Sequence, residues 1–197
     1  MEDICAQVGK NKQILAAARR VFAATGYYQA RVEDIAREAG VGKGTVYEYF
    51  TSKEELYLEM LLEIADSYVN GLVAVTGQPG AIRDKLLGIG QHLRGFFLEH
   101  GQLARMVLQD PGPVNRELQE HLFLIRKDAV RHVEALLAEA AAAGQIHPVD
   151  TDAAARFFLA GLAGVLLPGV IQELAPPEAV TMAVDIFLEG VQGTVDN

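Results

Sequence analysis

The sequence has few of the side chains that act as nucleophiles or soft metal ligands. Cys5 is the single cysteine among the 197 residues, and Ser52 and Ser67 are the two serines. One cysteine excludes a disulfide framework and a Cys-based zinc site, and it is typical of a reducing cytoplasm. The five histidines lack the close spacing of metal ligands. We therefore expect no metal, no cofactor and no nucleophile with a positioned base.

Long apolar runs and an export signal are also missing. The longest uncharged run, Phe157–Gln172, is shorter than the roughly 20 residues that a membrane span needs, and Pro168 and Gly169 interrupt it. The first residues are acidic where a signal peptide has a basic region. We expect a cytoplasmic protein with no membrane segment, in which this run forms a buried or intersubunit helix.

The acidic charge of the chain is unevenly distributed. The net charge of the whole chain is −9. Residues 1–53 have eight Lys and Arg against six Asp and Glu, whereas residues 54–197 have nine against twenty. A weakly basic head followed by an acidic body favours local attraction to nucleic acid. We therefore place two domains at 1–53 and 54–197.

The segment Val32–Lys53 has the pattern of a helix-turn-helix. Apolar residues recur at helical spacing on both sides of Gly40, over Val32–Ala39 and over Val46–Phe50. Two short helices joined by a glycine-containing turn place the second helix in the DNA major groove. A phosphate-binding loop is excluded for the lookalike Gly-Val-Gly-Lys-Gly-Thr, because glycine follows its lysine and a helix precedes it. The segment predicts a DNA-binding head.

Helical periodicity continues along the rest of the chain, without strand-like alternation. The helix that begins near Ser52 is expected to have one apolar stripe, formed by Leu56, Met60, Ile64, Tyr68, Leu72 and Val75. Residues 1–9 are expected to be a disordered tail, and Ser52 with Glu55 forms the Ser-x-x-Glu pattern of a capping box. We predict an all-α fold of about nine helices, in which the head precedes a larger ligand-binding and dimerisation body. The expected helices are Lys10–Gly26, two within Val32–Phe50, Ser52–Val75, Ile82–Phe97, Leu103–Leu108, Leu118–Ala140, one capped by Asp150 or Thr151, and one opened by Pro176–Glu178 that extends to Val191.

The order and spacing of motifs across residues 10–58 resemble the head of TetR-family transcriptional regulators. The matching segments are Ile14–Ala18, Phe22–Tyr27, Asp34–Val41, Lys43–Tyr47, Tyr49–Phe50 and Ser52–Leu56. The pattern Tyr27-x-Gln29-x-x-Val32, with Asn115–Leu118 in the body, is similar to the subgroup that regulates fatty-acid degradation and responds to acyl-CoA. The resemblance implies a homodimeric repressor that binds a palindromic DNA operator. A small apolar or acyl-type effector in the body would release it.

The resemblance also implies candidate DNA contacts. The matching recognition-helix positions are Lys43, Gly44, Thr45, Tyr47 and Tyr49, and Lys53 matches a phosphate-binding lysine. Lysine reaches a guanine edge or a phosphate, hydroxyl groups donate to phosphate, and glycine allows close backbone approach. Tyr49 is either such a contact or a core residue beside Phe50. The family's usual threonine cap is absent before Val32, where Arg31 is expected to supply the phosphate contact as a charge.

Large apolar side chains in the body suit either an ordinary core or a cavity for an apolar ligand. The candidates are Phe96, Phe97, Met106, Phe123, Phe157 and Phe158, with Arg126 as an anchor for an anionic ligand or as part of a solvated surface. Small residues such as Ala160, Gly161 and Gly164 predict that the last two helices form a two-fold, four-helix dimer interface. The ligand is expected to shift the helix from Ser52 to about Val75.

A second class of protein fits the same helical pattern. An all-α small-molecule binding protein or enzyme without a DNA role would show no salt-dependent binding to the DNA upstream of its own coding sequence. A regulator would show binding that requires Lys43 and Tyr47.

Overall fold

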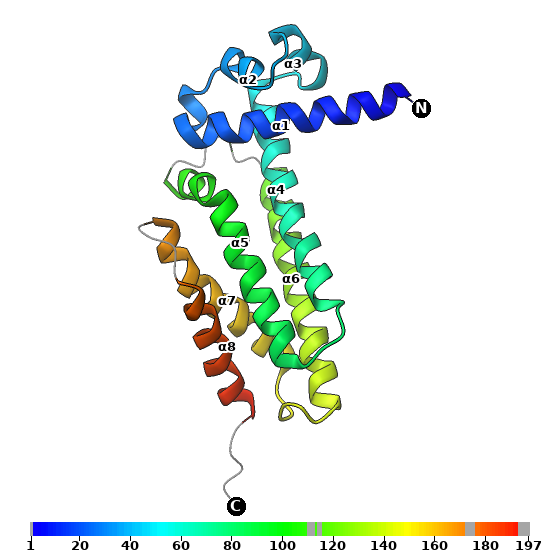
Figure 1. Cartoon of the computed structure of the whole chain (residues 1–197), viewed down its shortest axis with the longest axis vertical. Helices are drawn as coiled ribbons and strands as arrows, with labels where there is room; N and C mark the ends of the chain where they lie inside the picture. Colours follow the sequence, from blue (N-terminus) through cyan, green and yellow to red (C-terminus); the bar gives the residue numbers. More distant parts are fainter. Residues whose placement is uncertain (1, 110–112, 114–115, 172–175, 193–197) are drawn as a thin grey trace, which may run out of the picture. The chain divides into compact units, whose positions relative to one another are not determined.

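The computed structural model describes residues 2–109, 113, 116–171 and 176–192, and describes side chains in these ranges except at 2–8, 102–109, 117, 167–171 and 192. The described chain is all-α (Figure 1). Its helices are α1 (Glu2–Gln29), α2 (Val32–Glu38), α3 (Lys43–Tyr49), α4 (Lys53–Thr76), α5 (Ile82–Gln109), α6 (Arg116–Ala142), α7 (Thr151–Ile171) and α8 (Pro177–Gln192).

Two details of the predicted helix pattern are wrong. The segments Ile82–Phe97 and Leu103–Leu108 belong to one continuous helix, α5, so the described chain has eight helices rather than about nine. Gly101 weakens a helix without ending it, and no proline interrupts this one. The expected disordered tail is helical from Glu2 onward, because residues 2–9 contain no proline and begin with acidic residues that favour a helix N-terminus.

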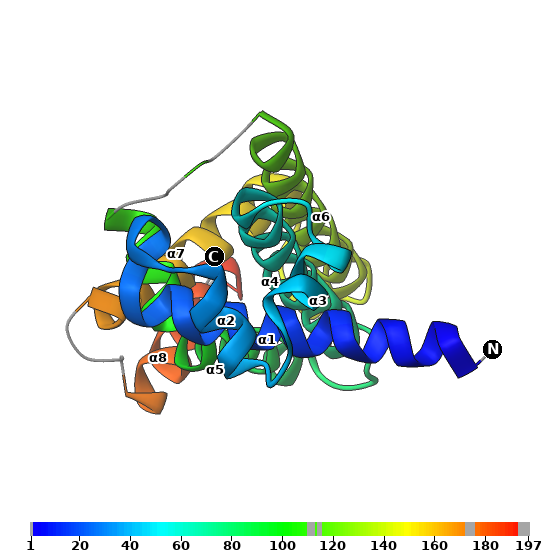
Figure 2. The same ribbon diagram turned by 90° about the horizontal axis from the view of Figure 1, so that it is seen from above.

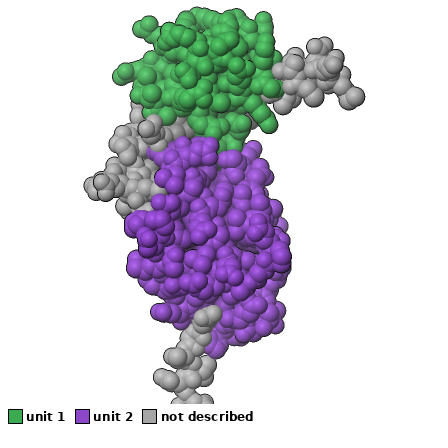
Figure 3. Space-filling view, in the orientation of Figure 1, with its two compact units in different colours: residues 1–65, 102–122 green, residues 66–101, 123–197 purple. Residues whose placement is uncertain are grey.

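The chain divides into two compact units (Figure 3). Unit 1 comprises residues 1–65 and 102–122, and unit 2 comprises residues 66–101 and 123–197. Three helices, α4, α5 and α6, contribute residues to both units. The predicted domain boundary after residue 53 stays a prediction.

The core of unit 1 forms where α1 packs against α2 and α2 packs against α3 (Figures 1 and 2). The buried residues Ile14, Leu15, Ala18 and Phe22 lie on one face of α1 at the predicted helical spacing. The ring of Phe22 meets the fully buried ring of Tyr57 on α4 edge to face, with 5.0 Å between centroids. These contacts fix α1 against the first turns of α4.

The last turn of α1 changes direction at Gly26. Its backbone angles are φ 77° and ψ 164°, a conformation that glycine adopts and other residues avoid. The Ala30 N–H closes the turn by donating to the Gly26 carbonyl at 3.2 Å. The turn brings the Tyr27 ring within 4.9 Å of the Tyr57 ring. The predicted end of the regular helix at Gly26 is therefore confirmed.

The predicted cap and apolar stripe of α4 are confirmed. The Ser52 Oγ accepts a hydrogen bond from the Glu55 N–H at 3.0 Å. The Glu55 carboxylate accepts hydrogen bonds from the Thr51 hydroxyl and from the Thr51 N–H. Both bonds lower the pKa of Glu55, and the bond from the hydroxyl has the larger effect. The stripe is buried at Leu56, Met60, Ile64 and Leu72.

The core of unit 2 draws on α4 to α8. Two glycines allow close helix packing, because a Cβ at Gly71 would lie 2.0 Å from the His92 ring and a Cβ at Gly90 would lie 2.4 Å from the Val180 side chain. The largest of the core side chains are Leu72, Leu86, Ile89, Leu93, Leu136, Leu137, Phe158, Leu162, Leu166 and Phe187.

The C-terminal end of α6 lies at the predicted glycine, and the start of α7 lies at a predicted cap. Gly144 has φ 70°, and the Gln145 N–H donates to the Ala140 carbonyl at 2.9 Å, as in a Schellman motif. The Asp150 carboxylate accepts a bond from the Ala153 N–H at 3.1 Å, so Asp150 rather than Thr151 caps α7. Over the described ranges, no helix combines the length and the hydropathy that a bilayer crossing requires.

The conformation of Gly26 yields a stability prediction. Gly26→Ala should lower the free energy of unfolding by about 1–3 kcal/mol, because it forces a Cβ into a glycine conformation. Gly9→Ala is the control in the same helix, where a Cβ meets nothing within 4 Å, and should leave stability equal or slightly higher. Urea unfolding followed by circular dichroism measures both. Equal stability of the two variants would contradict the assigned strain.

Candidate nucleic-acid interface

Helices α2 and α3 form the predicted helix-turn-helix. The turn between them passes through Gly40 at φ 66°, and the Val41 N–H donates to the Ala36 carbonyl at 2.9 Å. Buried Ile35 and Val46 face the core of unit 1 from the two helices. The Gln13 amide on α1 donates to the Ala39 carbonyl at 2.7 Å and so fixes the end of α2. The geometry holds α3 rigidly against α2.

The expected absence of a side-chain cap before α2 is confirmed. Arg31 occupies the N-cap position in an extended conformation and its side chain makes no capping bond. Its carbonyl accepts bonds from the Asp34 and Ile35 N–H groups at 3.1 and 3.2 Å. The Arg31 side chain is exposed. It is therefore available as a charge beside the start of α2.

The predicted recognition residues differ in exposure along α3. Lys43 and Gly44 are exposed, and Tyr47 is 44% exposed. Thr45 and Tyr49 are partly exposed, whereas Phe50 is buried. Lys43, Gly44 and Tyr47 thus lie on the solvent side of the helix, and Tyr49 lies at its edge.

Lys43 forms an ion pair that the sequence pattern did not indicate. Its Nζ lies 2.5 Å from the Glu33 Oε1 on α2 and 5.7 Å from the centroid of the Tyr47 ring. The bond to the ammonium group lowers the pKa of Glu33 and raises the pKa of Lys43. Both groups therefore stay charged at neutral pH.

Lys53 is placed at the junction of α1, α2 and α4. Its ammonium group donates to the carbonyls of Tyr27 at 2.9 Å, Ala30 at 3.2 Å and Tyr28 at 3.5 Å. It also lies 4.4 Å from the centroid of the Tyr27 ring. In the free protein these acceptors hold the lysine that was predicted to bind phosphate, and the phosphate contact itself stays a prediction.

The described ligand residues predicted in the body range from buried to mostly exposed. Phe96 and Phe97 are half-buried, and Phe158 is a core residue whose ring packs 4.9 Å from that of Phe187. Phe123 is 66% exposed, and Phe157 is 69% exposed. Arg126 is exposed, and the side chain of Met106 lies outside the described residues.

Phe96 belongs to an aromatic group between α4 and α5 that the sequence had indicated only in part. Its ring centroid lies 5.4 Å from Tyr68 and 4.8 Å from His100. His92 stacks on Tyr68 at 5.8 Å, and the His92 Nε2 lies 2.9 Å from the Tyr68 carbonyl. Burial raises the pKa of the Tyr68 hydroxyl. Tyr68 belonged to the predicted stripe of α4, but no spacing signal linked it to the histidines.

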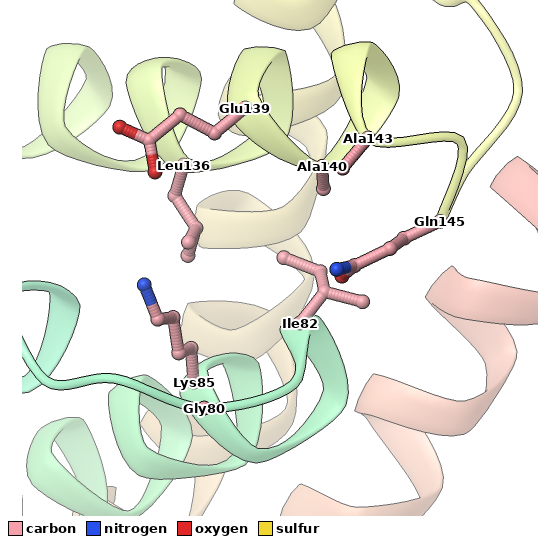
Figure 4. A pocket seen from close by; sticks show the side chains of 8 residues that line it. All are labelled: Gly80, Ile82, Lys85, Leu136, Glu139, Ala140, Ala143 and Gln145. Carbon is pink, nitrogen blue, oxygen red and sulfur yellow. The ribbon is translucent and has the colours of Figure 1, made fainter.

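Unit 2 also has a hollow of about 210 Å³ beside the start of α5 (Figure 4). Lys85 and Ile82 line it from α5, and Glu139 and Leu136 line it from α6 on the opposite side. Among the side chains that the structure describes, none of the predicted ligand residues lines this hollow. Within the described ranges, no three His, Cys, Asp or Glu side chains come together as a metal site.

An exposed α3 held by α2 against a packed head defines a helix-turn-helix DNA-binding protein. Residues 14–60 match the family described as "Bacterial regulatory proteins, tetR family". The fatty acid metabolism regulator protein of Bacillus subtilis (strain 168) is 30% identical over 138 residues, which cover 70% of this chain and 71% of the relative. The chain therefore belongs to the TetR family of transcriptional regulators.

Two further relatives extend the comparison. The HTH-type transcriptional activator FasR of Mycolicibacterium smegmatis (strain ATCC 700084 / mc(2)155) is 45% identical over 98 residues, 50% of this chain and 45% of FasR. The structure of FadR from Bacillus subtilis in complex with stearoyl-CoA has a TM-score of 0.75 and 22% identity, and the match covers 91% of this chain and 98% of FadR. The predicted all-α fold with a helix-turn-helix head is thus confirmed.

The bonds of Lys53 yield a second prediction. Lys53→Met should lower the free energy of unfolding of the DNA-free protein by about 1–3 kcal/mol, because backbone carbonyls lose a charged donor. Lys12→Met is the control, because Lys12 is exposed and has no partner in the described part of the chain. Urea unfolding tests both variants. An unchanged midpoint for Lys53→Met would show that these bonds add nothing to stability.

Proposed function

We propose that the protein is a dimeric, effector-responsive repressor that binds a palindromic operator. A DNA-binding domain over 1–53 precedes a ligand-binding and dimerisation domain over 54–197. Membership of a family of transcriptional regulators supports the DNA-binding role, and the exposed side chains of α3 supply a surface for it. The protein acts in the cytoplasm, where its DNA target lies, and works by binding without catalysis.

The proposed DNA contacts come from α3 and its surroundings. Tyr47 offers a hydroxyl on an exposed aromatic side chain, and Gly44 leaves the backbone open to close approach. The full set is Arg31, Lys43, Gly44, Thr45, Tyr47, Tyr49 and Lys53. In a dimer the two α3 helices must lie one DNA turn apart, about 34–36 Å, to enter successive major grooves.

An exposed apolar face on α7 and α8 supports the dimer. The two helices pack together (Figures 1 and 2). Phe157 on α7 is 69% exposed, and Met182 and Ile186 on α8 are 57% and 61% exposed. Exposed Ala160, Gly161 and Gly164 add small side chains to the same helix as Phe157. Large apolar side chains beside small ones suit a four-helix contact with a second copy.

The proposed effector is a small apolar or acyl-type compound, with acyl-CoA as the first candidate. Support comes from the relative named as a fatty acid metabolism regulator and from the stearoyl-CoA complex of FadR. In this chain the half-buried ring of Phe97 packs against the apolar core of unit 2, and the half-buried ring of Phe96 lies 5.4 Å from that of Tyr68, which also packs against this core. We place the effector beside these two rings, next to α4.

The proposed mechanism acts through α4. Gly71 and the His92 ring allow α4 to pack closely against α5. A ligand that enters beside Phe96 and Phe97 would therefore displace α4. The first turn of α4 bonds to the head through Lys53. A shift of operator occupancy from 99:1 to 1:99 requires roughly 5.5 kcal/mol of differential binding.

Gel shift on the DNA upstream of the coding sequence tests the regulator. We expect salt-dependent binding by the purified protein, and loss of binding at physiological salt in Lys43→Ala and in Tyr47→Ala. Long-chain acyl-CoA should release the DNA, whereas CoA alone should not. Because FasR is named an activator, a reporter gene under the same upstream DNA decides the direction of control. Binding that survives both substitutions would contradict the proposed contacts.

The dimer has its own test. Ile186→Glu places a charge in the proposed contact and should convert the dimer to a monomer, with weaker operator binding as the result. Leu98→Glu is the control, because Leu98 is similarly exposed but lies on α5. Light scattering coupled to size-exclusion chromatography measures the mass of each variant. A monomeric wild type, or a dimeric Ile186→Glu, would contradict the assignment.

A further inference from the structure

The helix proposed to enter DNA has a single basic side chain, and that side chain is paired in the free protein. Lys43 is the only Lys or Arg in α3. Its Nζ contacts the Glu33 carboxylate at 2.5 Å, and the two side chains are 50% and 56% exposed. The pair therefore lies at the solvent surface, where a phosphate would have to meet it. α3 offers the phosphate no unpaired cation.

The other basic residues of the head show how much this pair matters. Residues 1–53 contain eight Lys and Arg. Three arginines in this segment form ion pairs with carboxylates, and Lys53 donates to backbone carbonyls. In the described part of the segment, the basic residues with neither kind of partner are Lys10, Lys12 and Arg31. All three lie outside α3.

We propose that Glu33 limits the affinity of the head for DNA by competing with phosphate for Lys43. A phosphate that draws Lys43 away must break the ion pair, and it leaves the Glu33 carboxylate facing a second negative charge. Phosphates are the same in every sequence, so this cost applies to any duplex. The inference rests on the proposed contact between Lys43 and DNA.

A lower affinity for phosphate reduces non-specific DNA binding and makes release by an effector easier. Sequence-independent attraction to phosphate accounts for essentially all non-specific binding, and each unpaired cation of the protein adds to it. Glu33 lowers that attraction without removing the base-reading side chains of α3. Weaker overall binding also reduces the differential affinity that an effector must supply to empty the operator.

Removing the carboxylate while keeping its shape tests the inference. Full-length wild type, Glu33→Gln and the control Glu48→Gln are titrated by fluorescence anisotropy against the upstream DNA and against an unrelated duplex of equal length. Glu48 is exposed on α3 and has no ion-pair partner in the described residues, so it reports the effect of charge alone. Glu33→Gln should bind both duplexes roughly threefold more tightly at low salt, as expected for an exposed ion pair.

The pairing itself is tested by comparing Lys43→Ala with the double variant Glu33→Gln, Lys43→Ala at low salt, where the weakened phosphate attraction of these variants is still measurable. In this background the effect of Glu33→Gln should fall towards that of Glu48→Gln, because the ion-pair partner of Glu33 is gone and only the weaker attraction of Arg31 remains. Equal gains for Glu33→Gln and Glu48→Gln, a gain as large in Lys43→Ala as in the wild type, or weaker binding by Glu33→Gln would each overturn the inference. A wild type that binds neither duplex overturns the proposed function instead, and the inference with it. Circular dichroism confirms that every variant is folded.

Discussion

The ammonium group of Lys53 joins three segments on which the DNA-binding head depends. It donates to carbonyls at the end of α1 and just before α2, while its own backbone begins α4. A helix terminus leaves carbonyls without intrahelical partners, and a lysine is a favourable partner for them. The start of α4 thereby fixes the entry into α2, and α2 in turn positions α3. Any displacement of the first turn of α4 must either move α2 or break these bonds.

Gly26 makes this arrangement possible. Its left-handed φ turns the chain out of α1, so that the Tyr27 carbonyl and ring both meet Lys53. The Tyr27 ring also packs on Tyr57 of α4. The pKa of the Tyr27 hydroxyl is raised, mainly by burial and to a smaller extent by Glu54 and Tyr28. A polar contact and an aromatic contact thus hold the same junction from two sides. The polar contact and the aromatic contact are coupled, because both require the bend at Gly26.

Sequence reasoning succeeded where one helix face decides the structure, and failed where two faces are apolar. The single stripe of α4 was predictable, and the cap of α7 was predicted as Asp150 or Thr151, because periodicity and capping chemistry act locally. Phe157 and Phe158 are adjacent in sequence, yet one is exposed and the other packs on Phe187. Periodicity did not predict which of them faces the core. The pair between Lys43 and Glu33 was equally invisible, since an exposed contact leaves no hydrophobic pattern.

The distribution of charge places opposite demands on the two proposed contacts. The body is strongly acidic, so two bodies repel one another, and an apolar face on α7 and α8 is the kind of contact that can offset this repulsion. Added salt screens that repulsion and therefore favours the proposed dimer. The same salt competes with Lys and Arg for phosphate and weakens DNA binding. Because two heads must act together on a palindrome, the measured salt dependence combines both effects. At protein concentrations above the dimer dissociation constant, the salt dependence of binding reports the DNA contact alone.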